Sequence, residues 1–368
     1  MTKVVYIVFN IDKANEFEWV AERLDSSKFS LEFISIHSKS ETPFKDFCAQ
    51  HKIPFHHVSY FSKKNIVVAF LKTFLLLWKL KPNVVHAHLF EGGLIGITAA
   101  FFAGIKKRIY TRHYATQHHE YAPNGVKYDK FTNLLSTCII ATSKNVEDVL
   151  IRMEACPPEK VKLIHHGFPL EDFRNISEER ILAIKEKYKI NRQPIVGVVS
   201  RYLHLKGIQY IIPAFKKILE TYPNAMLVLA NAKGEYKSTI QQLLSTLPSQ
   251  NYVEIPFESD NAALFKCFDI FVHVPINAKI EAFGQIYIEA LAAGIPSIFT
   301  LSGVAAEFIV NKENALVVDF ENENQIYDAL KLLLSNNALS ESIIENGYRS
   351  LNMFSIEQKM AALEKLYL

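Results

Sequence analysis

Short β-rich runs alternate with helix-like segments along most of the 368 residues of this chain. In the first half, the predicted strands are residues 4–9, 31–36, 84–88, 107–111 and 137–141. The predicted helices between them are residues 15–25, 66–80, 94–103, 127–135 and 144–153. Strands that alternate with helices of this length indicate right-handed βαβ units around a parallel sheet. The pattern therefore predicts an α/β fold that binds ligands at the carboxyl ends of its strands.

The second half continues this alternation, with predicted strands at residues 195–200, 226–230, 253–255, 270–274 and 316–318. A chain of this length can form two domains, each with a full core. A charged, helix-like segment separates the two halves and is typical of a linker. We therefore predict an N-terminal domain at 1–175, a hinge at 176–193, a C-terminal domain at 194–352 and a terminal helix at 353–368.

The most distinctive stretch is EAFGQIYIEALAAGIP, residues 281–296, which predicts a loop followed by an amphipathic helix. The first backbone N–H groups of such a helix have no partner within it, and Gly284 lets a phosphate approach them. Glu281 in the loop and Glu289 in the helix can accept hydrogen bonds from sugar or ribose hydroxyls. The alternative is a solvent-facing pair of glutamates that flanks a core helix.

A second charged site is predicted in the loop between the strand at 195–200 and the helix that begins at Ile208. Arg201 and Lys206 lie five residues apart in this loop and can converge on one anion, while Gly207 frees the backbone. Solvated loop charges are the alternative interpretation. The acidic motif that follows later in the same half favours an anion site.

The full 281–296 string, with its Phe-Gly pair and its Glu-Ala-Leu-Ala-Ala-Gly-Ile-Pro ending, resembles the donor-site signature of retaining glycosyltransferases of family 4. The resemblance implies a GT-B fold, in which two Rossmann-like domains face each other across a cleft. It also implies that the terminal helix crosses back to the N-terminal domain. It is dense over residues 195–320 and thinner in the first half, where Asn10 follows the first strand in place of the family's Gly-Gly.

The resemblance also implies roles for individual residues. Arg201 and Lys206 would grip the donor diphosphate together with the helix start, Glu281 would orient the sugar, and Glu289 would hold the ribose. His113 would lie close to the transferred sugar. The remaining donor-binding positions implied by the family are Phe283, Gly284, Gln285, and, near the nucleotide base, Pro256 and Phe257.

Eleven of the 13 histidines fall in the first 175 residues, which raises the question of a metal site. Adjacent histidines diverge on a strand, and the chain has neither the His-Glu-x-x-His motif nor Cys-rich spacing. We therefore predict no metal, and instead expect Arg112 and its neighbouring histidines to bind an acceptor phosphate. The four separated cysteines favour a reduced, cytosolic chain.

Charge and hydropathy also bear on membranes. Residues 1–175 contain 23 Lys or Arg against 17 Asp or Glu, whereas the remainder contains 18 against 21. The apolar segment at 66–80 is too short to span a bilayer and is interrupted by Lys72 and Lys79. It is either a core helix or a helix that partly enters the membrane interface. The N-terminus lacks the features of a secretory signal, so we expect a cytoplasmic protein. The alternative is a protein that binds peripherally to the inner face of the cell membrane.

The resemblance implies a retaining hexosyl- or N-acetylhexosaminyl-transferase, and the basic first half with its Phe- and Lys-rich helix favours a role in surface polysaccharide biosynthesis. Its expected donor is a nucleoside-diphosphate sugar, most simply a UDP-sugar, and its expected acceptor is a saccharide or lipid-linked glycan. No cofactor, metal or nucleic acid is expected. The alternatives are a non-catalytic nucleotide-sugar-binding subunit, which the missing Gly-Gly would favour, and another GT-B enzyme such as a sugar-nucleotide epimerase.

Overall fold

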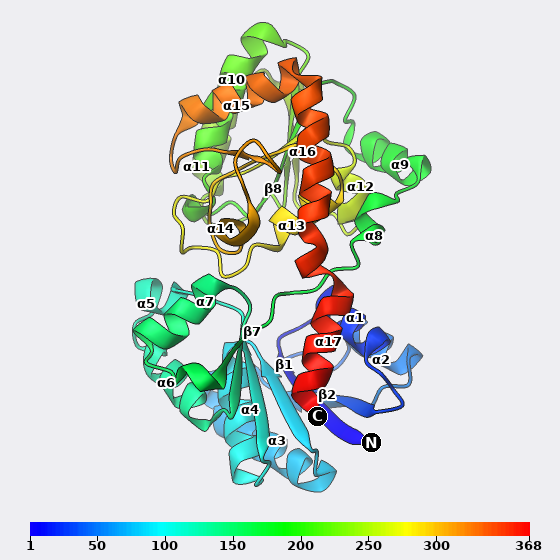
Figure 1. The fold of residues 1–368 in the computed structure, drawn as a ribbon, viewed down its shortest axis with the longest axis vertical. Coiled ribbons are helices and arrows are strands. Elements are labelled where there is room, and N and C mark those ends of the chain that lie inside the picture. Colours follow the sequence, from blue (N-terminus) through cyan, green and yellow to red (C-terminus); the bar gives the residue numbers. More distant parts are fainter. The chain divides into compact units, whose positions relative to one another are not determined.

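The computed structural model describes residues 1–368 and contains two compact units (Figure 1). The first unit comprises Met1–Phe168 together with Ile356–Leu368, and the second comprises Pro169–Ser355. Each unit is built around its own parallel sheet. None of the helices combines the length and hydropathy that a membrane span requires.

The sheet of the first unit has seven parallel strands in the order β3-β2-β1-β4-β5-β6-β7. These strands are β1 (Thr2–Phe9), β2 (Phe29–His37), β3 (Phe55–Ser59), β4 (Val84–His88), β5 (Lys107–Arg112), β6 (Cys138–Ala141) and β7 (Val161–Leu163). The central strands β1 and β4 are buried almost throughout, because both faces of a parallel sheet are covered by helices. In register, Val4 lies between Leu31 of β2 and Val84 of β4.

Helices connect these strands as the sequence predicts. They are α1 (Asn15–Arg23), α2 (Pro43–Gln50), α3 (Ile66–Leu80), α4 (Phe90–Phe102), α5 (Gln117–Tyr121), α6 (Gly125–Leu135) and α7 (Lys144–Asp148). All five strands and five helices predicted for this half are present, with shifted ends. The prediction missed β3, β7, α2 and α5. Strand β3 is a half-exposed edge strand with two histidines, and α2 is a short helix that begins with Thr42 as its N-cap and Pro43 as its first residue.

The last helix, α17 (Ile356–Tyr367), belongs to the first unit, as predicted. The Tyr367 hydroxyl hydrogen-bonds to the hydroxyl of Tyr6 on β1 and lies 2.7 Å from Nδ1 of His86 on β4. The Lys359 ammonium of α17 donates to the Glu16 carboxylate of α1. The two ends of the chain therefore share one core.

The second unit has six parallel strands in the order β10-β9-β8-β11-β12-β13. They are β8 (Ile195–Val199), β9 (Met226–Ala230), β10 (Tyr252–Ile255), β11 (Ile270–His273), β12 (Ser297–Phe299) and β13 (Leu316–Val317). The helices are α8 (Glu171–Arg174), α9 (Glu178–Tyr188), α10 (Ile208–Thr221), α11 (Lys237–Leu244), α12 (Asn261–Phe265), α13 (Gln285–Ala292), α14 (Ala305–Phe308), α15 (Glu323–Ser335) and α16 (Asn337–Arg349). Strands β8 and β11 are adjacent, so the segments that follow them meet at one sheet edge.

Residues 176–193, which the sequence analysis assigns to a hinge, lie within the second unit. Arg180 of α9 pairs with Asp260 at 2.7 Å, and the Tyr188 hydroxyl donates to Glu258 at 2.7 Å. Ile184 between them is buried. The charged face that suggested a free linker is thus the outer face of a packed helix, and the boundary between the units falls at Phe168–Pro169.

Candidate active site

The basic loop after β8 is held against the end of β11. It runs through a single 3₁₀ turn, His204–Lys206, and reaches Gly207, where α10 begins. Gly207 has φ of +72°, and a Cβ there would lie 1.8 Å from the carbonyl oxygen of Val274. The backbone N–H of Ile276 also donates to the Leu205 carbonyl at 3.1 Å. Only glycine permits this close approach, which fixes the position of Lys206.

Glu281 joins this loop through its side chain. Its Oε1 accepts a hydrogen bond from Lys206 Nζ at 2.5 Å and lies 3.3 Å from Nε2 of His273, the last residue of β11. The Ser302 hydroxyl oxygen accepts from the Glu281 backbone N–H at 3.3 Å. The structure therefore brings together two predicted site residues, Lys206 and Glu281, and adds His273, which the sequence analysis missed.

His273 could have been found from its position. It ends a strand whose other residues are Ile270, Phe271 and Val272, and a polar residue at the carboxyl end of a buried parallel strand lies where such sheets bind ligands. Burial lowers the pKa of His273, and its hydrogen bond to Glu281 only partly offsets this effect. The imidazole is therefore neutral at neutral pH and can donate its Nε2–H to the carboxylate.

Glu281 is ionised under the same conditions. Burial alone would raise the pKa of its carboxyl group, but the hydrogen bond from His273 and the Lys206 ammonium outweigh burial and lower the pKa to about 2. A carboxylate with so low a pKa is a poor proton donor. An ionised carboxylate can accept hydrogen bonds from neutral hydroxyl groups, and this one also holds Lys206 in place.

The start of α13 is the second element that the sequence analysis predicts to bind an anion. Gly284 adopts φ of +89°, and a Cβ at this position would lie 2.5 Å from the ring of Tyr287. The N–H groups of Gln285 and Ile286 precede the hydrogen bonds of the first turn, the first of which Tyr287 donates to the Gly284 carbonyl at 3.2 Å. The Gln285 side chain is exposed, whereas the ring of Phe283 is buried against Phe354 at 5.8 Å between centroids. Phe283 therefore positions the loop through its ring.

Glu289 lies one turn farther along α13. Its carboxylate has no hydrogen-bond or ion-pair partner in the chain, and burial raises its pKa to about 7. An unpaired carboxylate in a poorly solvated position is costly unless a ligand donates to it. This environment suits the predicted contact with ligand hydroxyls.

The other predicted donor residues lie near the same edge of the sheet. Arg201 follows β8, and its guanidinium is exposed and forms no ion pair. Pro256 and Phe257 follow β10, and the Phe257 side chain is 64% exposed with Lys233 Nζ 5.7 Å from its ring centroid. No contact within the chain tests their predicted role beside the nucleotide base.

In the first unit, His113 follows β5 and is surrounded by histidines. Its Nε2 lies 3.2 Å from His88 Nδ1, and its ring stacks on His166 at 5.5 Å between centroids. Burial lowers the pKa of His113 to about 4 despite the nearby Glu16 carboxylate, so the ring is neutral. Its predicted role beside the transferred sugar stays a prediction.

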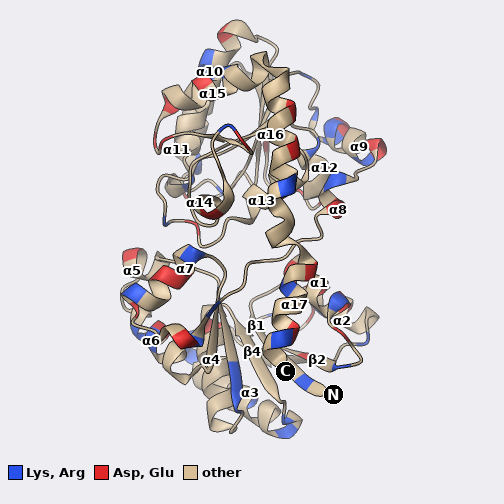
Figure 2. Cartoon of the chain, viewed as in Figure 1, with Lys and Arg blue, Asp and Glu red and all other residues tan.

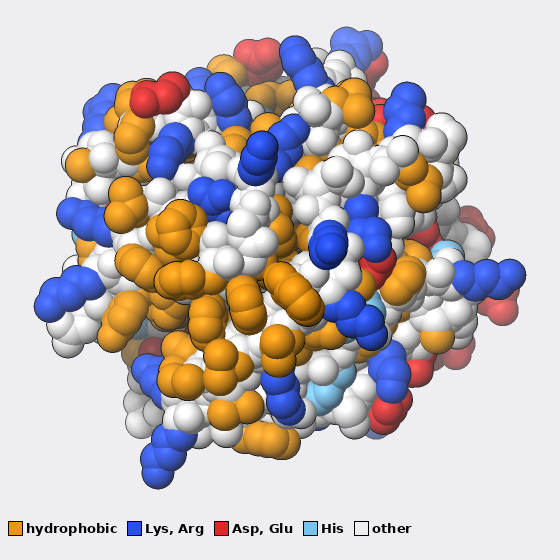
Figure 3. Space-filling view, turned by 90° about the horizontal axis from the view of Figure 1, so that it is seen from below, with side chains coloured by type: hydrophobic (Ala, Val, Ile, Leu, Met, Phe, Trp, Pro, Cys, Tyr) orange, Lys and Arg blue, Asp and Glu red, His pale blue; other side chains and the backbone are white.

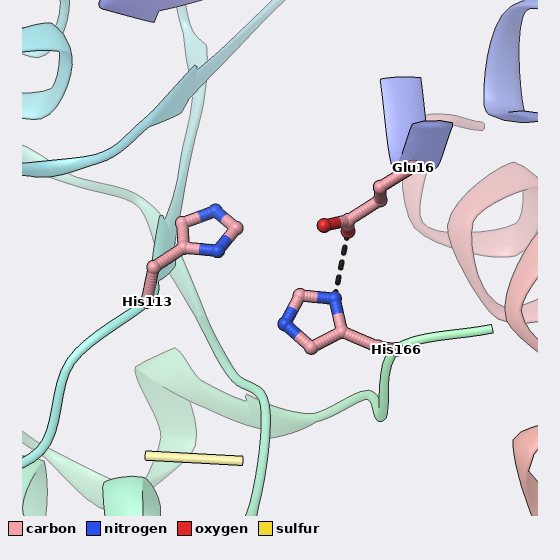
Figure 4. A group of neighbouring side chains, drawn as sticks. All are labelled: Glu16, His113 and His166. Atoms are coloured by element: carbon pink, nitrogen blue, oxygen red, sulfur yellow. Dashed lines mark hydrogen bonds and ion pairs between the residues drawn. The ribbon is translucent and has the colours of Figure 1, made fainter. Parts of the chain in front are cut away.

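Glu16, His113 and His166 point toward one another (Figure 4), and each offers a ligand atom within 4.8 Å of the others. The sequence analysis did not anticipate this group, because its members come from three separate segments. The Glu16 carboxylate already accepts hydrogen bonds from His166 Nδ1, at 2.8 Å, and from the Lys359 ammonium. The ammonium thus neutralises the carboxylate within the unit.

The expectation that Arg112 binds an acceptor phosphate is wrong. Its side chain is fully buried, and Nη2 donates to Glu154 at 2.6 Å and to Asp129 at 3.1 Å. Its neighbours in the predicted phosphate site join the same network: His118 lies 2.7 Å from Asp129, and His119 lies 3.4 Å from Glu154. Arg112 is paired with both carboxylates, which are distant in sequence, so its guanidinium is not available to bind a phosphate.

Comparison with known proteins identifies the class. Residues 181–350 match the family described as glycosyl transferases group 1, and residues 20–172 match the family described as Glycosyltransferase Family 4. Together with the two parallel sheets, these matches show that the chain belongs to the family 4-like glycosyltransferases of the GT-B fold.

The chain is also similar to particular relatives within this class. The chain is 28% identical to the capsular polysaccharide biosynthesis glycosyltransferase CapM of Staphylococcus aureus, over 81% of this chain and 79% of CapM. It is 25% identical to the alpha-monoglucosyldiacylglycerol synthase of Acholeplasma laidlawii, over 82% and 79% of the two chains. Among solved structures, Anabaena HepE in complex with UDP-glucose matches with a TM-score of 0.83 at 18% identity, covering 99% of this chain and 100% of HepE. The last likeness concerns the fold alone.

Proposed function

We propose that this glycosyltransferase moves a sugar from a UDP-sugar, with retention of anomeric configuration, to a glycan or lipid-linked acceptor of surface polysaccharide or glycolipid synthesis. The observation that carries the proposal is the cluster of Lys206, Glu281 and His273 beside the start of α13. It combines a cation and free helix N–H groups for a diphosphate with an ionised carboxylate for sugar hydroxyls. The similarity to CapM and to the alpha-monoglucosyldiacylglycerol synthase supports the acceptor classes, and the binding of UDP-glucose by HepE supports the donor class.

In the proposed reaction, the bond between the anomeric carbon and the diphosphate oxygen breaks while the acceptor oxygen bonds to that carbon. The leaving diphosphate gains negative charge, which Lys206, Arg201 and the N–H groups at the start of α13 would stabilise. Stabilising developing charge with fixed donors is a large term in such transfers, about 3–4 kcal/mol for one donor. No metal is needed in this scheme.

Glu281 would orient the sugar and Glu289 the ribose. Because the pKa of Glu281 is about 2, it has no proton to donate as a general acid. The proposed scheme uses no protein nucleophile. The acceptor attacks the face from which the diphosphate departs, and a diphosphate oxygen takes the acceptor proton. His113 is proposed to bind a sugar hydroxyl, and Pro256 and Phe257 to contact the base.

The test has two stages. A thermal-shift screen of UDP, GDP, ADP and their sugars should show the largest stabilisation with the UDP series, because a ligand at about 100 times its Kd adds about 2.7 kcal/mol. A mass assay with the stabilising sugar nucleotide should then detect its hydrolysis or transfer. Stabilisation by GDP or ADP alone would contradict the donor assignment, and binding without any turnover would contradict the catalytic one.

A further inference from the structure

Helix α3 presents an unusual outer face. Its inner residues Ala69, Thr73 and Leu77 are buried, whereas the opposite face is apolar and exposed. The exposed apolar residues are Val67, Val68, Leu71, Leu75 and Trp78. Trp78 is 63% exposed, although burial of a tryptophan side chain is strongly favourable. An apolar stripe of this length on the solvent side of a helix indicates an interaction surface.

Neighbouring helices extend this surface. Helix α4 packs against α3, and α6 packs against α4; these two helices contribute the exposed residues Phe101, Phe102, Tyr128, Phe131 and Leu134. A hollow of about 530 Å³ opens between the three helices, lined by Ile66, Phe70, Leu94 and Phe131 among others. Its lining is almost wholly apolar, with Lys127 at its border. We call this combined area the α3 face.

Exposed lysines lie around the α3 face; Figure 3 shows basic side chains at the border of an apolar area, and Figure 2 colours the Lys and Arg positions along the chain. These lysines are Lys63, Lys64, Lys72, Lys79, Lys81, Lys106, Lys127 and Lys130. Residues 61–83 and 101–108 contain no Asp or Glu. The one acid of α6, Asp129, is buried beneath the face and paired with Arg112. The face therefore presents apolar side chains within a border of uncompensated positive charge.

This chemistry distinguishes between partners. A second copy of the chain would bring a second set of the same lysines to a symmetric contact, and like charges would oppose each other without compensating acids. A bilayer with anionic headgroups satisfies both components. Aromatic and aliphatic side chains enter the boundary between headgroups and acyl chains, while lysines keep their ammonium groups at the phosphates.

We propose that the α3 face docks on an anionic membrane surface and that the hollow between α3, α4 and α6 receives one hydrocarbon chain of a lipid. This inference does not depend on the donor site. If the proposed function also holds, docking places the enzyme on the surface that carries a lipid-linked acceptor.

The test is flotation of the full chain with phosphatidylcholine vesicles, with and without phosphatidylglycerol. Binding is expected only to the anionic vesicles and should weaken as salt is added. Lys72→Gln with Lys79→Gln should reduce the partition coefficient by about 10-fold or more. Leu71→Glu and Trp78→Glu should each reduce it further. Lys216→Gln with Lys237→Gln and Leu182→Glu, which change exposed residues of the second unit, are matched controls that should bind normally.

Each outcome has a defined meaning. Equal binding to neutral vesicles, no vesicle binding, or an equal loss in the control variants would overturn the proposal. Light scattering that shows a dimer which Trp78→Glu dissociates, without vesicle binding, would identify a second copy as the partner. The thermal shift with UDP reports the donor site alone, so loss of vesicle binding with an intact UDP response separates this inference from the proposed function.

Discussion

Arg112 in the first unit and Arg201 in the second both stand at the carboxyl end of a buried parallel strand, but their surroundings are opposite. Arg112 is fully buried between Asp129 and Glu154 and also lies 3.8 Å from the ring centroid of Tyr114. Arg201 is exposed and unpaired. The strand-helix pattern therefore predicts that an arginine lies at the sheet edge. The acids around the arginine decide whether it forms ion pairs within the fold or is free to bind a ligand.

The same contrast extends to carboxylates. In the first unit, Glu16, Asp129 and Glu154 each have cationic or imidazole partners within the unit. In the second unit, Glu289 has none, and Glu281 keeps Lys206 beside a sheet edge. These carboxylates of the first unit are paired within the unit, whereas Glu289 and the Lys206–Glu281 pair of the second unit lie where a ligand can contact them.

The largest effect should come from Arg112→Leu. This change leaves Asp129 and Glu154 buried without their cation, and breaking such a pair costs about 3–5 kcal/mol of unfolding free energy. Chemical denaturation measures this loss. Arg201→Leu is the matched control and should change the unfolding free energy by less than about 0.5 kcal/mol, as surface substitutions do. Equal stability of the two variants would remove the distinction between the two arginines.

These arginines also show which features of the fold and the site can be predicted from the sequence. Hydrophobic periodicity located ten of the thirteen strands, because buried parallel strands are short apolar runs, and it missed the short strands β3, β7 and β12. The Glu281 loop was found because its residues are contiguous. The partners of Arg112 lie 17 and 42 residues away, and His273 lies eight residues from Glu281 on another element. Periodicity within one segment does not report such pairings, which depend on how separate elements pack.

Glu281→Gln should cause the next largest effect, on catalysis. The amide keeps the shape of the side chain but loses the charge that orients Lys206 and accepts sugar hydroxyls. We expect kcat to fall about 100- to 1,000-fold, comparable to the loss of one fixed electrostatic group. The affinity for UDP should hold or increase, because Lys206 is freed for phosphate. Glu313→Gln, at an exposed position, is the control. Unchanged kcat would remove the central assignment of this site.

The pH dependence of stability should reveal Glu289. Burial raises its pKa to about 7 in the folded chain, against 4.5 as its ordinary value. Between these values the folded chain holds a proton that the unfolded chain has lost, so stability falls as pH rises from 4.5 to 7 and then levels off. The loss should reach at most about 3 kcal/mol. Comparing thermal unfolding of the native chain with Glu289→Gln isolates this contribution, which the glutamine variant should lack.

The smallest predicted effect belongs again to Arg201. Arg201→Leu should weaken UDP binding about 10-fold, because an exposed guanidinium gives one charge-assisted contact to a phosphate but remains partly solvated. Calorimetric titration with UDP and with uridine separates the phosphate contribution, since uridine affinity should not change. Arg192→Leu, which removes an arginine hydrogen-bonded to Asn224 in the same unit, should leave both affinities intact. Unchanged UDP binding by Arg201→Leu would show that an exposed, unpaired arginine at a strand end predicts the donor site no better than the buried Arg112 does. The contrast drawn between the two arginines would then not hold for Arg201.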